Sequence, residues 1–79
     1  MNTLDFGENY YSKAYILELI SSKFDKFRLE HREKENRNKE GWRNSEFYKG
    51  KVNGMKYLIK ITQNINDDQW CLVYISRLY

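Results

Sequence analysis

The period of the hydrophobic pattern changes once along this chain of 79 residues, near Gly41. Before Gly41, apolar side chains recur every three or four residues, as in a helix, and after it they alternate with polar ones, as in a strand. After an irregular lead-in over residues 1–9, the pattern therefore predicts one helical segment and then a group of strands. A chain this short is expected to form a single domain, residues 1–79, with a thin hydrophobic core.

The helical spacing predicts one long amphipathic helix over residues 10–40. Its apolar stripe consists of Leu17, Ile20, Phe24, Phe27 and His31, at spacings of 3, 4, 3 and 4. After His31 the stripe stops, but good helix formers continue as far as Gly41, the expected C-cap. Asn9 or Ser12 is the expected N-cap, because a short polar side chain accepts a hydrogen bond from the first turn.

Residues 46–78 are expected to form three strands. We place them at residues 46–52, 55–63 and 69–78. Between the first two stands Asn53-Gly54, and these residue types tolerate the two positive φ angles of a type I′ hairpin turn. The polar run over residues 64–68 predicts the second turn. The expected fold class is α+β, an α-β-β-β arrangement in which the helix packs on a three-stranded antiparallel meander.

A two-residue turn fixes the register of the first two strands, so that Val52 faces Met55 and paired residues share a face of the sheet. One face then carries apolar core side chains. The other face carries lysines with aromatic side chains between them. The binding residues expected on this second face are Phe47, Lys49, Lys51, Lys56, Lys60, Trp70 and Tyr74.

The register of the third strand stays open. With the second turn over residues 64–68, the core receives Cys71, Val73 and Ile75, and the lysine face receives Trp70, Leu72 and Tyr74. A slip of one residue would exchange these two sets, and both are apolar enough to be buried.

Interleaved basic and aromatic side chains on a sheet predict binding of RNA or single-stranded DNA, because bases stack on rings while ammonium groups hold phosphates. The alternative is that the lysines solubilise an exposed face and protect an edge strand. A second basic surface is expected along the predicted helix. Its members are Arg28, Arg32, Lys39 and Arg43. This helix stripe suits a phosphate backbone or an acidic protein surface, or else is a solvated face laced with salt bridges.

Side chains that carry chemistry are few. The chain has one histidine, His31, on the apolar line of the predicted helix, where a structural role is favoured over a general base. It has one cysteine, Cys71, which lies mid-strand among apolar neighbours and has no second cysteine for a disulfide. We therefore expect no catalytic residue, no metal site, no cofactor and no enzymatic activity.

The two C-terminal strands resemble the last hairpin of RelE-type ribonuclease toxins. The resemblance rests on Tyr57-Leu58-Ile59-Lys60-Ile61 and Cys71-Leu72-Val73-Tyr74-Ile75, followed by Arg77-Leu78-Tyr79. It implies that basic and aromatic tail residues, here Arg77 and Tyr79, contribute to messenger RNA cleavage. A RelE-like toxin is the second alternative among the functions considered.

Net charge is +3, and 16% of the residues are aromatic, a composition that favours interfaces with acidic partners or nucleic acid. No signal peptide or long apolar run is apparent, which predicts a cytoplasmic location in a host cell and no membrane contact. A small, proline-free chain rich in Tyr, Asn, Lys and Ile is similar to accessory proteins of phages. The first hypothesis is thus a non-enzymatic inhibitor of a host nucleic-acid-handling or defence complex, such as a CRISPR effector. RNA or single-stranded DNA binding is the alternative, and a homodimer is possible.

Overall fold

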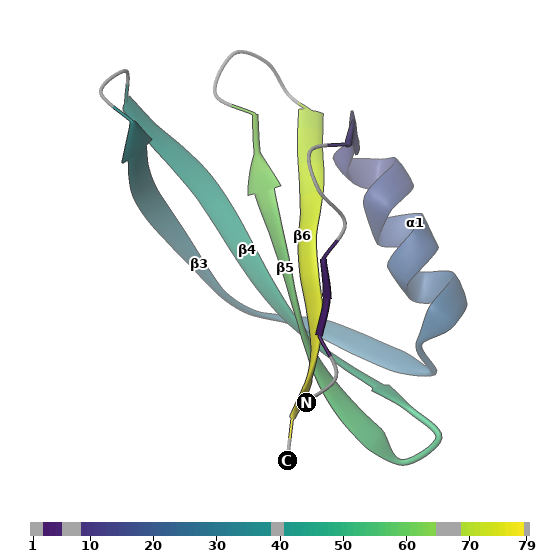
Figure 1. Cartoon of the computed structure of the whole chain (residues 1–79). Coiled ribbons are helices and arrows are strands. Elements are labelled where there is room, and N and C mark those ends of the chain that lie inside the picture. The colour runs from purple at the N-terminus through teal and green to yellow at the C-terminus, as the bar shows by residue number, and fades with distance from the viewer. Residues whose placement is uncertain (1–2, 6–8, 39–40, 65–68, 79) are drawn as a thin grey trace.

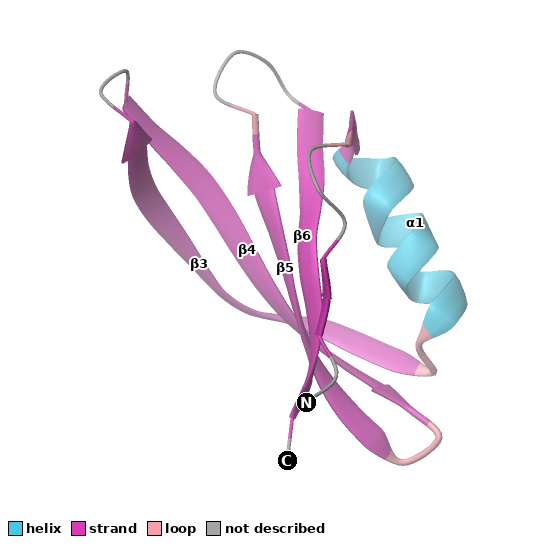
Figure 2. Cartoon of the chain, viewed as in Figure 1, coloured by secondary structure: helices cyan, strands magenta, loops and turns pink. Residues whose placement is uncertain are grey.

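The computed structural model describes residues 3–5, 9–38, 41–64 and 69–78, which form one helix and one six-stranded antiparallel sheet. The elements are β1 (Thr3–Asp5), β2 (Tyr10–Ser12), α1 (Lys13–Lys23), β3 (Lys26–Asn38), β4 (Gly41–Val52), β5 (Met55–Gln63) and β6 (Gln69–Leu78). The strand order is β1-β6-β5-β4-β3, and β2 also pairs with β6 (Figure 1). Colouring by secondary structure shows how far strands dominate the chain (Figure 2).

The expected α-β-β-β fold is wrong, because the predicted helix over residues 10–40 ends at Lys23 and its second half is the strand β3. The amide of Phe24 still donates to the carbonyl oxygen of Ile20 at 3.1 Å. However, the Phe24 backbone is extended, with φ −116° and ψ 137°. The next amide, of Asp25, donates to the Lys51 carbonyl oxygen at 2.9 Å, so the chain passes directly from helix to sheet.

Two patterns overlap in β3, and tertiary pairing selects one of them. Phe27 continues the helical spacing, but Phe27 and Leu29 also alternate with charged residues, which is the period of a strand. Helix propensity differs by less than about 1 kcal/mol per residue among these residue types, so long-range pairing outweighs it. Pairing with β4 extends as far as Asn38 opposite Gly41. Gly41 therefore opens β4 instead of capping a helix.

Local capping and turn chemistry follow the prediction. The Ser12 hydroxyl accepts a hydrogen bond from the Tyr15 amide at 3.2 Å, so Ser12 is the N-cap of α1. Asn53 and Gly54 have φ angles of 51° and 76°, as a type I′ turn requires. Val52 pairs with Met55, and the predicted register of this hairpin is confirmed along its length.

The predicted faces of β6 are partly wrong because a bulge interrupts its pairing with β5. Lys60 lies opposite Tyr74 but Ile61 lies opposite Leu72, which leaves Val73 as the extra residue. Tyr74 therefore faces the lysines and Ile75 faces the core, as expected. Before the bulge the two sets are exchanged: the core receives Trp70 and Leu72, and Cys71 lies opposite Thr62 on the other face.

The core lies between α1 and one face of the sheet. From α1 it contains Ile16, Ile20 and Phe24, and from the sheet Tyr48, Ile59, Ile61, Trp70 and Ile75. The Phe24 ring packs directly over Gly50, where a Cβ would lie 2.7 Å from Phe24 Cδ1. Only a residue without a side chain leaves room for that ring. One face of the sheet is thus covered by α1, and the opposite face presents the lysines.

Candidate functional site

The sheet face opposite α1, here called the basic face, carries three lysines side by side. Lys26 pairs with Lys51, and Lys51 pairs with Lys56, so one row crosses β3, β4 and β5. All three side chains are exposed. Like charges directly opposite each other on neighbouring strands destabilise a sheet. This row is therefore expected to oppose folding.

A second row of the basic face adds two cations and one carboxylate. Arg28 lies opposite Lys49. Glu30, the extra residue at a bulge in β3, reaches both, with 3.5 Å from its Oε1 to Lys49 Nζ and 3.9 Å from its Oε2 to Arg28 Nη2. The first two rows line a groove of about 370 Å³. Its lining includes Lys26, Arg28, Lys49, Lys51 and Lys56, so five cations surround it.

The third row contains the aromatic residues of the basic face. The His31 ring stacks on Phe47 with a centroid distance of 4.4 Å and an interplanar angle of 10°. Lys60 Nζ lies 5.3 Å from the centroid of the same Phe47 ring, and Tyr74 lies opposite Lys60. Phe47 is only 8% exposed, whereas the His31 side chain is 48% exposed. A planar group from solvent would therefore meet His31 before Phe47.

The fourth row closes the basic face at its far end. Ser45 lies opposite Thr62, and their hydroxyl oxygens are 3.1 Å apart in a buried hydrogen bond. Cys71, the next residue across, is also buried. On β3, however, the residue opposite Ser45 is Glu33, whose side chain is exposed and whose Oε1 lies 3.3 Å from His31 Nε2, so the accessible part of the face ends in a carboxylate beside the His31 ring.

The structure brings together most of the residues predicted for the lysine face. Those that share it are Phe47, Lys49, Lys51, Lys56, Lys60 and Tyr74. Trp70 does not, since it lies in the core below Lys13, whose Nζ is 4.9 Å from the indole centroid. The bulge in β6 is the physical reason, and it was not predictable from the alternation of side chains.

The predicted helix stripe does not form, because its three described residues, Arg28, Arg32 and Arg43, lie on strands. Arg28 joins the basic face from β3, whereas Arg32 lies opposite Glu46 and binds it on the core side. Arg43 is in β4, and its Nε is buried with no hydrogen-bond partner among the described residues. Lys39 lies outside the described residues.

The position of the lysines within the sheet bears on the solubilising alternative. Lys49 and Lys51 lie on β4 and Lys56 on β5, and both strands have a neighbour on each side. Protection of an edge strand therefore accounts only for the cations of β3. The three internal lysines need another explanation.

A second charged cluster, which the sequence reasoning missed, surrounds Glu46 on the core side. Its Oε2 accepts hydrogen bonds from Lys13 Nζ at 2.8 Å and from Arg32 Nε at 3.0 Å. Its Oε1 accepts one from the Tyr48 hydroxyl at 2.6 Å. Glu46 is 4% exposed, so these contacts join α1, β3 and β4 through one buried carboxylate. The available clue was its position opposite Ile61, on the predicted core face.

The surroundings of this carboxylate favour its ionised form. Burial by itself raises the pKa of Glu46, but the hydrogen bonds from Lys13, Tyr48 and Arg32 outweigh it and hold that pKa below its ordinary value of 4.5. Burial and the adjacent carboxylate of Glu46 raise the pKa of Tyr48 well above its ordinary value. Both carboxylate oxygens of Glu46 accept hydrogen bonds, so the Glu46 cluster stabilises the packing of α1 on β3 and β4.

Among the described residues, no group of three or more His, Cys, Asp or Glu side chains lies close enough to hold a metal ion. The one described helix lacks the length and apolar character needed to span a membrane. The chain matches no family model, no curated protein and no solved structure.

Proposed function

We propose that this protein binds RNA or single-stranded DNA across the basic face. The observation that carries the proposal is the row formed by Lys26, Lys51 and Lys56. Within the described part of the chain, none of these side chains has a carboxylate within ion-pair distance. A row of like charges that is expected to destabilise the sheet, and that continues from the edge strand β3 onto the internal strands β4 and β5, is best explained by an anionic ligand.

Phosphates are the anions that this arrangement suits. Adjacent strands lie about 4.8 Å apart, so the ammonium groups form a continuous positive surface along the groove. Lysine side chains are flexible point charges that bind phosphate without reading base sequence. Binding of this kind releases condensed counterions and is therefore strongly weakened by salt.

The third row favours a single strand over a duplex. The exposed ring of His31 stacks on Phe47, so a base can stack on the outer side of His31. Bases in a duplex are already stacked on one another, and α1, which otherwise would be the element to enter a major groove, is on the other face of the sheet. The basic face thus offers phosphate contacts and one stacking position.

Fluorescence anisotropy with a labelled oligouridine and a duplex of equal length tests the proposal across a salt series. We expect tighter binding of the single strand and a steep loss of affinity with salt. The double substitution Lys51→Gln with Lys56→Gln should lower the slope of log affinity against log salt by about 1.4, because single-strand contacts contribute about 0.7 each. The double substitution Lys23→Gln with Lys34→Gln removes the same charge outside the groove and is the matched control.

The stacking position has its own test. His31→Ala should weaken oligouridine binding by about 1–3 kcal/mol, while His31→Phe retains a ring and most of the affinity. Equal affinities for the two variants and the wild-type chain would contradict stacking.

A complete lack of oligonucleotide binding at physiological salt would contradict the nucleic-acid proposal. The basic face would then favour an acidic protein surface, as the inhibitor hypothesis predicts. That hypothesis stays a prediction, as does the toxin resemblance: Arg77 pairs with Tyr57, and Tyr79 lies outside the described residues.

A further inference from the structure

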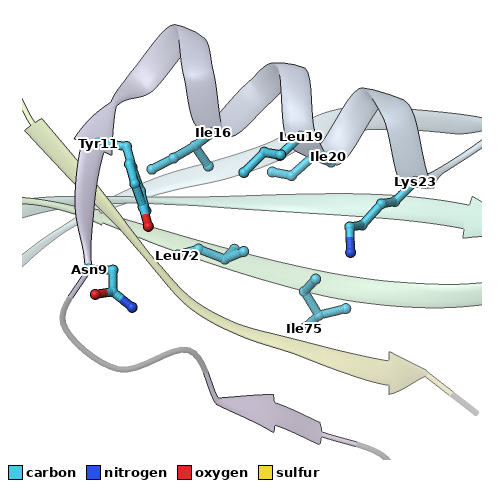
Figure 3. A pocket seen from close by; sticks show the side chains of 8 residues that line it. All are labelled: Asn9, Tyr11, Ile16, Leu19, Ile20, Lys23, Leu72 and Ile75. Atoms are coloured by element: carbon cyan, nitrogen blue, oxygen red, sulfur yellow. The ribbon is translucent and has the colours of Figure 1, made fainter.

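We infer that a cleft between α1 and β6 binds a small monocarboxylate with an apolar body, of the size of benzoate or hexanoate. The cleft has a volume of about 200 Å³. It lies on the sheet face opposite the basic face, so it is independent of the proposed nucleic-acid site. Figure 3 shows the side chains that line it, from the helix above and the strand below.

The walls of the cleft are aliphatic. They are formed by Ile16, Leu19 and Ile20 of α1 and by Leu72 and Ile75 of β6. Ile16, Ile20 and Ile75 are 0%, 2% and 8% exposed, so the cleft reaches into the core. Protein interiors leave few voids larger than a water molecule, and apolar voids of about 150 Å³ in other proteins stay dry and accept benzene. This space is large enough for one small apolar group.

Polar groups stand only at the ends of the cleft. Lys23, in the last turn of α1, points its amine from the helix toward β6, and Tyr11 and Asn9 lie near the opposite end (Figure 3). No Asp or Glu is among the described residues that line the cleft. A cation facing an apolar space without a neighbouring carboxylate is complementary to an organic acid. The carboxylate would lie at Lys23 and the apolar body between Leu19 and Leu72.

Such a ligand would contact both α1 and β6 and would therefore stabilise the packing of the helix on the sheet. A ligand that binds only the folded state raises the midpoint of thermal unfolding. The residues of the Glu46 cluster do not line the cleft. That cluster joins α1 to the sheet through Lys13, at the opposite end of the helix from Lys23. Binding is thus expected without rearrangement of the described ion pairs.

Amide-resolved NMR titration with benzoate and hexanoate tests the inference, with benzyl alcohol and hexanol as neutral analogues of the same shape. We expect saturable shifts at Leu19, Lys23, Leu72 and Ile75, and at least tenfold tighter binding of the acids than of the alcohols. In Lys23→Met this preference should disappear, because the ammonium group is lost while the stem is kept. Lys34→Met, at an exposed position that lines neither the cleft nor the basic groove, removes an equal charge and should leave the preference intact.

Filling the cleft provides a second variant. Leu19 is half-buried at the cleft wall, so Leu19→Phe should fold and should weaken acid binding at least fivefold. Equal affinity for acids and alcohols in the wild-type chain would overturn the carboxylate class. Absence of shifts, or shifts confined to the lysines of the basic face, would overturn the site itself. None of these outcomes depends on whether the chain binds oligonucleotides.

Discussion

On the helix side of the sheet one buried carboxylate, Glu46, receives hydrogen bonds from three side chains. On the opposite side Lys26, Lys51 and Lys56 adjoin one another, and no carboxylate of the described residues lies between them. The Glu46 cluster has matched charges and geometry. The lysine row has unmatched charges in exposed positions. The two clusters lie on strands of the same sheet, and β4 contributes to both.

This difference separates stability from binding. Removing a member of the Glu46 cluster leaves buried polar groups unpaired, which destabilises a fold. Removing a lysine from the row relieves repulsion, so the fold gains while an anionic ligand loses a contact. The same kind of substitution, loss of one charge, is therefore expected to have opposite effects on the two faces.

The largest effect is expected for Glu46→Ala. The Tyr48 hydroxyl would be buried without an acceptor, and Lys13 and Arg32 would lose theirs, so the free energy of unfolding should fall by about 3 kcal/mol. Lys13 and Arg32 are partly exposed and can be rehydrated, which limits the loss. Urea denaturation measures it. Glu18→Ala, at an exposed helix position, is the matched control and should change stability by less than about 0.5 kcal/mol.

Gly50→Ala should come next, with a loss of about 1–3 kcal/mol from overpacking. The new Cβ would lie 2.7 Å from the Phe24 ring, on the helix side of the strand that carries Lys49 and Lys51 on its other side. Phe24→Leu in the same chain should recover part of the loss, because the smaller side chain makes room. If the two substitutions were additive, the contact between Gly50 and Phe24 would not be the cause. Oligouridine binding by the folded variant should match that of the wild-type chain.

Local chemistry predicted the parts of the fold that depend on a few adjacent residues. The turn at Asn53-Gly54 and the cap at Ser12 follow from backbone preferences of single residues, and the turn then fixes the register of β4 and β5. Most of the lysine face was therefore predictable, since it depends on that hairpin. The C-terminal strand was predicted as a strand, but its bulge at Val73 moved Trp70 to the core.

The remaining features depend on residues far apart in the sequence. The segment after Phe24 satisfies both a helical and a strand period, and only its pairing with β4 selects the strand. Glu46 meets Lys13 and Arg32 across 33 and 14 positions of the chain, so no local pattern indicates the cluster. A charged residue predicted on a core face is the one sequence feature that points to such a tie.

The decrease in the free energy of unfolding at low pH should depend on Glu46. Because its pKa is lowered in the folded state, its contribution is complete above the ordinary value of 4.5 and is lost as pH falls through the lowered value. Unfolding free energies measured by urea at a series of pH values should therefore decrease in this acid range. Glu46→Gln cannot titrate, so its stability should vary less with pH there than that of the wild-type chain. If the free energy of unfolding depended on pH identically in Glu46→Gln and in the wild-type chain, the Glu46 cluster would not be the cause of the decrease at low pH.

The smallest effect on stability is expected for a lysine of the basic face. Lys51 has a lysine directly opposite on each neighbouring strand, so Lys51→Gln should raise the free energy of unfolding by about 0.2–1 kcal/mol at low salt. Lys34→Gln, where the opposite residue is Asn44, relieves no such pair and should leave stability nearly unchanged. The gain at Lys51 should diminish in high salt, because screening weakens repulsion between exposed charges. A loss of stability on neutralising Lys51 would mean that the row supports the fold, and the main argument for an anionic ligand on the basic face would fail.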